Sequence, residues 1–294
     1  RLERGVDVAR GLAGVERERV SHGAVLVSGD ESWRESAVLR AAVALLDDAP
    51  SLGVRTRVRF HLGTSEVGAR LVAAGGRIEA GAIHPVRIAL DAPVVARAGD
   101  RFVLRTASPA MTIGGGAVVD PQPAARRAKP APSAGASEQL RLGWIAAECG
   151  GDGLAMADIP VRLGVLPGGV AQLVDSTRSV VRLGDRVYDV AIRARLRDRL
   201  LADVRAWHKA SPLEAGLPLQ QARSQLRARD TLFDDIVSAL VERAKIELRG
   251  SVLVRNGWKA GAGADAAKLA EIVVALEAGG VSPLSVPELA EQFG

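Results

Sequence analysis

The chain has 294 residues, with 39 Lys and Arg against 34 Asp and Glu, a formal charge of +5 and a pI near 9.9. Hydrophobic residues at 48% and charged residues at 25% exclude a disordered chain, and aromatics at 3% argue against a stacking platform for single-stranded nucleic acid. The single cysteine, Cys149, excludes a disulfide framework and a paired-cysteine zinc or redox site. No apolar run reaches the ~18 residues of a membrane helix, and the first residues lack a signal-peptide core, so we expect a cytoplasmic protein without membrane contact.

Short strands are expected in the first 120 residues. The segment VRTRVRFHL (54–62) alternates strictly between apolar side chains and Arg55, Arg57, Arg59 and His61. Further strands are predicted over 86–90 and over 101–105, the second after a Gly-Asp turn signal. Short strands without long helical patterns between them predict an antiparallel β-barrel or sandwich.

The composition changes at residues 121–137 (PQPAARRAKPAPSAGAS), which predict a linker because proline, small and cationic residues bury little apolar surface. Beyond it, helical patterns recur with a period of about 65 residues. Residues 173–190 resemble residues 240–257, and each segment ends a helix and then gives two short strands around a glycine. We interpret the repeat as tandem winged-helix domains at 138–192 and 193–259, with the start of a third at 260–294.

Catalytic motifs do not occur in the sequence. No Gly-Lys pair exists, which excludes a GxxxxGK[ST] phosphate loop, and there is no GxSxG nucleophile motif. The four histidines, at positions 22, 61, 84 and 208, lack the spacing of metal ligands. The run Gly114–Gly116 lacks the third glycine of a dinucleotide-binding motif and favours a tight or bulged turn between strands. We therefore expect the chain by itself to be non-catalytic.

Basic residues give the only binding signal. Cations at two-residue spacing, as in 55–59, lie ~7 Å apart and could follow a phosphate backbone, although an exposed face whose cations pair with carboxylates explains them equally well. The third helix of the second winged unit, 230–244, opens with three aspartates that would repel phosphates. Basic residues of the two units lie instead on the wings, as either phosphate contacts or solubilising charge: Arg182 and Arg186 in the first unit, then Lys245, Arg249 and Arg255 in the second. These units therefore look more like spacers than DNA readers.

Several motifs resemble one family. GVDVARGLAGVERERVSHGAVLV (5–27) looks like the closing strands of the second domain of translation elongation factors, and residues 58–71 with 99–121 resemble their third, barrel domain. HLGTSEV and SPAMTIGGGAV are similar to the selenocysteine-specific elongation factor. The helical segments SPLEAGLPLQQARSQL (211–226) and VSPLSVPELAEQF (281–293) resemble the extension of that factor. The resemblance covers nearly the whole chain and is weakest over 30–51.

The resemblance implies a domain organisation and partners. Residues 1–29 would close domain II, and 30–120 would form barrel domain III. The family's GTPase domain, with its GTP and Mg²⁺ sites, is not among these residues. The implied partners are selenocysteinyl-tRNA, the ribosome paused at a UGA codon, and the selenocysteine insertion element of the mRNA. The last would bind a further winged helix outside this sequence.

The resemblance also implies RNA contacts on the barrel. Backbone near Thr112 and Gly114–Gly116 would approach the T-stem of the tRNA, since glycine permits close approach to phosphate. Met111 stands where the general factor carries an arginine. Together with the basic residues above, the RNA-binding candidates are Arg55, Arg57, Arg59, Arg105, Thr112, Gly114, Gly115, Gly116, Arg182 and Arg186.

Two other functions are compatible with parts of the pattern. A winged-helix transcription regulator with a β-barrel sensor domain would dimerise and carry basic third helices, so the acidic third helices count against it. A structural module without RNA contact is the other alternative.

Overall fold

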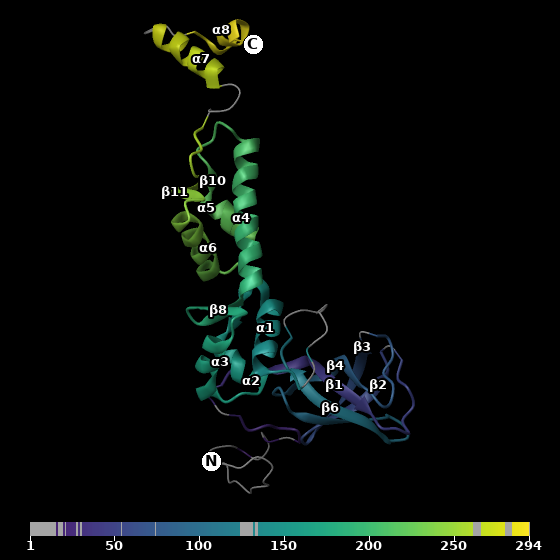
Figure 1. The fold of residues 1–294 in the computed structure, drawn as a ribbon. Helices are drawn as coiled ribbons and strands as arrows, with labels where there is room; N and C mark the ends of the chain where they lie inside the picture. The colour runs from purple at the N-terminus through teal and green to yellow at the C-terminus, as the bar shows by residue number, and fades with distance from the viewer. Residues whose placement is uncertain are drawn as a thin grey trace. The chain divides into compact units, whose positions relative to one another are not determined.

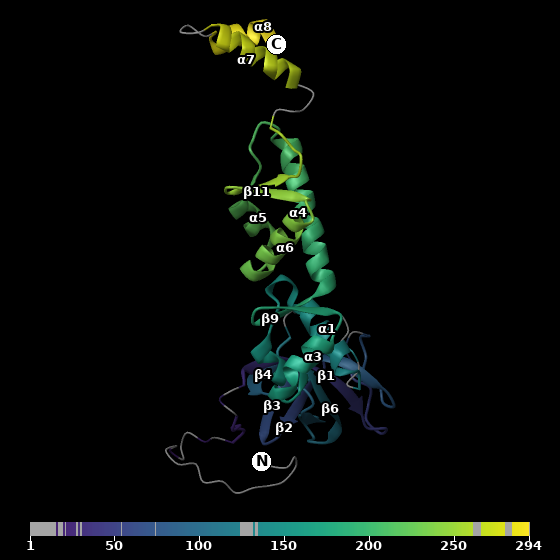
Figure 2. The same ribbon diagram turned by 60° about the vertical axis from the view of Figure 1, so that its left-hand side comes forward.

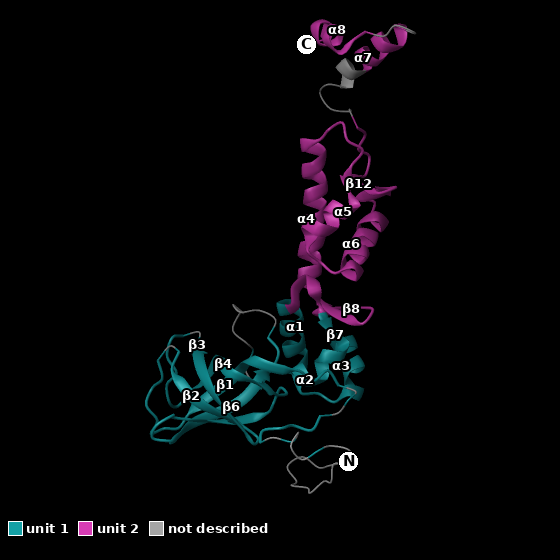
Figure 3. Cartoon of the chain, turned by 180° about the vertical axis from the view of Figure 1, so that it is seen from behind, with its two compact units in different colours: residues 1–148, 154–178 teal, residues 149–153, 179–294 magenta. Residues whose placement is uncertain are grey.

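A computed structural model describes residues 16, 20, 22–27, 29, 31–53, 55–73, 75–123, 132, 135–260, 266–279 and 284–293, and of 266–269 only the backbone. The predicted closing strands of domain II (1–29) and the centre of the predicted linker (121–137) lie mostly outside these residues. The chain divides into two compact units, 1–148 with 154–178 and 149–153 with 179–294 (Figures 1 and 3). The domain boundaries expected from the sequence stay predictions.

Six strands of the first unit close into an antiparallel barrel, in the order β1-β4-β3-β2-β5-β6 (Figure 1). Their bounds are Glu35–Leu45 (β1), Arg57–Leu62 (β2), Ser65–Ala73 (β3), Ile83–Val95 (β4), Arg101–Arg105 (β5) and Thr112–Asp120 (β6). The predicted β-barrel, followed by helices and small sheets, is confirmed.

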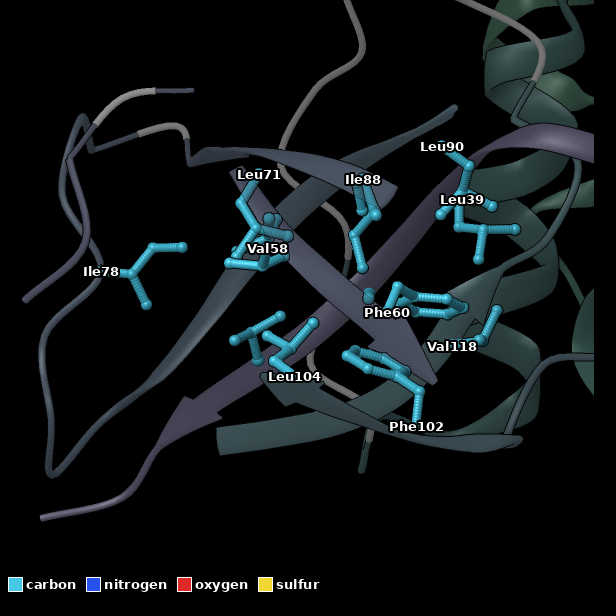
Figure 4. Packing of buried hydrophobic residues seen from close by; sticks show 14 of the residues in the cluster. Leu39, Val58, Phe60, Leu71, Ile78, Ile88, Leu90, Phe102, Leu104 and Val118 are labelled. Carbon is cyan, nitrogen blue, oxygen red and sulfur yellow. The ribbon is translucent and has the colours of Figure 1, made fainter. Parts of the chain in front are cut away.

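The barrel core is built from alternate residues of β1 to β5, and β6, whose register is shifted, contributes Ile113 and Val118. Phe60 and Phe102 lie 4.8 Å apart between ring centroids, and Leu71, Ile88 and Leu104 are fully buried around them (Figure 4). Each such side chain contributes about 1.5–3 kcal/mol on burial. Because side chains alternate between the two faces of a strand, the residues between these core positions face outward.

The strand predicted over 54–62 begins only at Arg57, so its expected first part is wrong. Arg55 has a φ of 62°, in the left-handed region, which interrupts the extended backbone. Its N–H donates to the carbonyl of Leu71, and the N–H of Leu71 donates to the carbonyl of Thr56. Arg55 therefore lies in the turn before β2 and not on the strand.

The glycine run is also not a turn. Gly114, Gly115 and Gly116 lie inside β6, and the bulge that the sequence suggested sits just before them, where the register shifts at Leu104/Arg105. A Cβ on Gly116 would lie 2.0 Å from the carbonyl oxygen of Ala42, and one on Gly115 would lie 2.5 Å from that of Phe102. Glycine is needed here because neighbouring strands approach too closely for a side chain.

Helices of the first unit pack on the barrel through buried ion pairs. Arg162 donates to Asp120 over 2.7 and 3.1 Å, with side chains 5% and 1% exposed. Arg40 pairs with Glu148 at 2.6 Å and lies 4.7 Å from the ring centre of Trp144. The elements after the barrel are α1 (Glu138–Cys149), β7 (Leu154–Ala155), η3 (Met156–Asp158), α2 (Ile159–Leu163), η4 (Pro167–Gly169) and α3 (Val170–Ser176).

The second unit is formed by helices and small antiparallel sheets (Figure 2). Leu200, Val204, Phe233, Ile236 and Leu253 are buried in its core. Its elements are η2 (Gly150–Asp152), β8 (Val180–Leu183), β9 (Arg186–Asp189), α4 (Val190–Ala210), β10 (Leu217–Pro218), α5 (Leu219–Leu226), α6 (Asp230–Glu242), β11 (Ile246–Arg249), β12 (Val252–Arg255), α7 (Ala266–Ala278) and α8 (Val286–Phe293). No helix in the described part of the chain has the length and apolarity needed to cross a bilayer.

Candidate nucleic-acid interface

Five arginines occupy adjoining positions on the outer face of the barrel. Cross-strand register places Arg59 opposite Arg105 on β5, and Arg57 opposite Arg70 on β3. Arg87 on β4 stands opposite Val72, one outward position along from Arg70. We call the set Arg105, Arg59, Arg57, Arg70 and Arg87 the arginine row.

The row follows from the alternation of the four strands. Each member lies next to core residues in sequence, as Arg59 does between Val58 and Phe60 and Arg70 between Ala69 and Leu71. Directly opposite side chains on two strands are about 4.5–5.5 Å apart at Cβ, and diagonal neighbours about 7–8 Å. The guanidinium groups therefore form a continuous positive surface across β5, β2, β3 and β4.

Few groups neutralise this surface. Arg59 lies 3.8 Å from Glu66, with both side chains half exposed, and such a pair contributes about 0–1 kcal/mol. The carboxylate of Asp91 lies beside Gly68 on the same face. Among the described residues, the Nε atoms of Arg87 and Arg105 are buried without a hydrogen-bond partner. Like charges opposite each other, as in Arg57 and Arg70, destabilise a sheet, so an anionic ligand would relieve the repulsion.

A phosphate group fits this arrangement chemically. The planar guanidinium offers two parallel N–H donors to phosphate oxygens and remains charged at every physiological pH. No group of three His, Cys, Asp or Glu side chains that could hold a metal ion occurs in the described residues. The guanidinium groups of this face can therefore bind polyanions by charge.

Thr112 extends the row onto β6, where it is the register partner of Arg105. The β5–β6 loop is closed by a 2.9 Å hydrogen bond from the N–H of Thr106 to the carbonyl of Met111, and the Met111 side chain is 60% exposed. Arg105 donates to the carbonyl of Ala110 in this loop over 3.0 Å. Thr112 and Arg105 thus form one end of the same surface.

The three candidate glycines differ in orientation. Gly114 and Gly116 are the register partners of Leu45 and Val43, which are core residues, so they face inward. Gly115 faces outward and borders an open, mostly apolar groove with Ala44, Val103, Ala117 and other residues of β1, β5 and β6. The packing of neighbouring strands explains all three glycines, and their contact with RNA stays a prediction.

The remaining candidates are placed elsewhere. Arg55 is exposed in the turn before β2. Arg186 donates to the carbonyls of Asp152 and Gly153 over 2.7 and 2.9 Å, and Arg182 donates to that of Gly184 over 3.0 Å. These two residues of the second unit hold the backbone around the β8–β9 hairpin, which leaves fewer donors for RNA.

Sequence reasoning missed two members of the row, Arg70 and Arg87. Each stands between buried apolar residues, so alternation alone could have marked both as outward cations. Their proximity to Arg57 and Arg59 depends on the pairing of β3 with β2 and β4, which single-strand patterns do not contain.

Helix α6 of the second unit begins with neutralised charges. Arg223 contacts Asp230 and Asp234 at 2.5 and 2.8 Å, and Arg193 pairs with Asp235 at 2.6 Å. The hydrogen bond that Arg193 donates to Asp235 raises the pKa of Arg193. The start of α6 therefore presents three aspartates that are each paired within the protein, and the exposed Arg229 precedes them as the N-cap.

Residues 39–125 match a family profile described as the beta-barrel domain of selenocysteine-specific elongation factor. The crystal structure of bacterial selenocysteine-specific elongation factor EF-Sec is similar with a TM-score of 0.61 and 17% sequence identity, over 95% of this chain and 44% of that one. At this identity the likeness shows a shared fold, and the chain spans less than half the length of that structure. A search of curated protein sequences gives no significant match. The resemblance predicted from residues 58–71 and 99–121 is confirmed.

Proposed function

We propose that this chain is the RNA-contacting part of a GTP-dependent elongation factor that delivers selenocysteinyl-tRNA to the ribosome at UGA codons. In this proposal the barrel binds the tRNA. The helices that follow connect the barrel to the mRNA selenocysteine insertion element through winged-helix domains.

The observation that carries the proposal is the arginine row, on a barrel whose sequence matches the selenocysteine-specific family over 39–125. The row has more positive charge than its own carboxylates neutralise. Within the part of the chain that the structure describes, Arg59 is the member that forms an ion pair, 3.8 Å from Glu66. A surface of this kind gains binding free energy from release of counterions by the nucleic acid. The T-stem backbone of the tRNA is the partner that the family resemblance suggests for it.

A GTP site does not fit the residues of this chain. The sequence has no Gly-Lys pair, so it cannot supply the lysine of a phosphate-binding loop. We therefore assign no step of GTP hydrolysis to these residues. In the proposed factor, GTP and Mg²⁺ would be bound by a GTPase domain outside this sequence.

The alternative of a transcription regulator is less well supported. A winged-helix DNA reader presents cations at the start of its third helix. In the second unit, α6 starts instead with Asp230 and Asp234, both held by Arg223. This charge pattern favours the RNA-delivery proposal.

Binding of selenocysteine tRNA by the whole chain tests the proposal. We expect it to bind more tightly than a general elongator tRNA, with an affinity that falls steeply as salt increases. The Arg57→Gln/Arg59→Gln variant should reduce the slope of log K against log salt concentration by about two.

The matched control is Arg77→Gln/Arg101→Gln, which removes two exposed or half-exposed cations of the same barrel outside the row. It should leave the slope near that of the unchanged chain. A salt-insensitive complex, or equal affinity for both tRNAs and a duplex DNA, would contradict the proposal.

A further inference from the structure

Three elements of the second unit converge at the end of α6. The N–H of Arg255, the last residue of β12, donates to Nε2 of His208 in the last turn of α4 over 3.0 Å. The next residue, Asn256, donates its N–H to the carbonyl of Lys245 and its side-chain amide to that of Ala244. These contacts bring together the end of α4, the turn after α6 and the end of β12. The three segments carry four cations, Lys209, Arg243, Lys245 and Arg255, which we call the cationic corner.

The corner is exposed and largely uncompensated. All four side chains are exposed, and within the described residues none is in an ion pair. Glu242 is the acid next to them in sequence, whereas Glu247 is engaged at 2.8 Å by Arg249. Arg193 and Arg199 on α4 differ from the corner, because Asp235 and Asp203 pair with them.

The turn that carries two of these cations has an unusual backbone. Ala244 has a φ of 50°, a left-handed conformation that costs an L-residue about 1–2 kcal/mol relative to glycine. The turn is held by hydrogen bonds from the N–H of Lys245 to Leu240 and from the Asn256 side chain to Ala244. Arg243 and Lys245 therefore flank a fixed turn, and the packing around it maintains the strain.

The pKa of His208 depends on its burial and on the nearby Arg255. Its ring is 7% exposed and stacks on Trp258 with 3.8 Å between centroids. Burial lowers its pKa first, and the positive charge of Arg255 lowers it further. Arg255 is therefore close enough to the ring of His208 to act on its charge.

We propose that the cationic corner binds the phosphate backbone of an RNA duplex. Its side chains are ammonium and guanidinium groups, which suit phosphate oxygens. The aromatic residue beside them, Trp258, is only partly exposed and stacks on His208, so it is less available to an unpaired base, which favours a duplex over a single strand. The choice of RNA over DNA rests on the proposed function. The acidic start of α6, with Asp230 and Asp234, is at the other end of the same helix.

Fluorescence anisotropy of the whole chain with a short blunt-ended RNA duplex tests this site. The Lys245→Gln/Arg255→Gln variant should reduce the slope of log K against log salt by about two. The control Arg195→Gln/Arg229→Gln removes two exposed cations of the same unit outside the corner and should leave the slope unchanged. In the Lys245/Arg255 variant, NMR should show a higher pKa for His208 if the fold is intact, because the charge of Arg255 is removed.

Three results would overturn the inference. The first is an unchanged salt slope in the Lys245/Arg255 variant, and the second is an equal reduction of the slope in the control. The third is a loss of binding by the Lys245/Arg255 variant that is seen only with phosphatidylserine vesicles or only with a DNA duplex. The tRNA experiment with Arg57 and Arg59 separates this site from the proposed function. If the chain does not prefer selenocysteine tRNA but the Lys245/Arg255 variant still has a reduced salt slope, the proposed function is contradicted and the cationic corner is supported. If the chain prefers selenocysteine tRNA but the variant has an unchanged slope, only the cationic corner is contradicted.

Discussion

Arginine has opposite roles in two regions of the first unit. Between the barrel and its helices, Arg40 and Arg162 are buried and contact Glu148 and Asp120 at 2.6 and 2.7 Å. On the arginine row, the guanidinium groups are exposed or half-exposed, and the ion pair of Arg59 with Glu66 is 3.8 Å long. The same residue type therefore serves as an internal connection in one region and as an unsatisfied positive surface in the other.

The difference lies in what balances the charge. Burial lowers the pKa of Arg40, and the nearby Glu148 acts against that shift, so the internal pair is balanced within the protein. As far as the structure describes the chain, the row has no comparable set of carboxylates, so water and salt ions balance its charge. Removal of a carboxylate partner should consequently lower the free energy of unfolding strongly for the buried pairs and only slightly for the row.

The largest effect is expected for Asp120→Asn. The change leaves Arg162 buried without its carboxylate, which should lower the free energy of unfolding by about 3–5 kcal/mol. Urea denaturation measures this, with Glu66→Gln on the exposed face as the control, for which we expect a change below about 1 kcal/mol. Equal effects of the two variants would remove the distinction between the regions.

Gly116→Ala should destabilise the barrel by about 1–3 kcal/mol, because the new Cβ would lie 2.0 Å from the carbonyl of Ala42 and force the strands apart. Gly53→Ala is the matched change in open space, with no atom within 4 Å of its Cβ, and should be nearly neutral. Thermal unfolding of both variants checks this. A tolerated Gly116→Ala would mean that the packing of β1 does not explain the glycine, and a role in ligand approach would gain weight.

Arg70→Gln should raise the free energy of unfolding by about 0.2–1 kcal/mol, since it removes the like charge opposite Arg57. The same variant should bind tRNA more weakly, with a salt slope lower by about one. A variant that lost both stability and affinity would indicate that Arg70 is structural, as Arg162 is. Denaturation and binding measured on one protein sample distinguish these outcomes.

The smallest effect is expected for the pH dependence of stability in the second unit. There the buried imidazole of His208 lies next to the cation Arg255. The pKa of His208 is lowered from 6.5 in the folded state, so the unfolded chain binds the proton more readily. The contribution of His208 to the free energy of unfolding is fully present above pH 6.5. It is lost as the pH falls from 6.5 through the lower pKa of the folded state. His208→Gln should abolish this part of the pH dependence in urea denaturation between pH 7.5 and 5, and an unchanged profile would contradict it.

The barrel could be predicted from alternation because a strand with a buried face repeats every two residues, as Val58, Phe60 and Leu62 do. The outward direction of Arg57, Arg59 and Arg105 followed from the same pattern. The row itself did not, because Arg70 and Arg87 join it through the register of β3 and β4. Register depends on turns and on pairing with distant strands, which alternation within one strand cannot supply.

The role of the glycine run and the contact between helices and barrel could not be predicted from sequence patterns, for another reason. A run of glycines fits a turn as well as a crowded strand, and only the carbonyls of Ala42 and Phe102 distinguish the two. The pairing of Asp120 with Arg162 joins residues on either side of a proline-rich segment that predicts separation. Spatial neighbours, and not local composition, decide both features.

The register of β1 has a consequence for the extent of the arginine row. Arg40 stands directly opposite Arg87 on the outer face, so it occupies the next position after the last member of the row. Trp144 and Glu148 of α1 cover it. Helix α1 therefore ends the row after Arg87, and in the proposed tRNA complex the nucleic acid would leave the barrel at this position; release of α1 would add the guanidinium of Arg40 to the row.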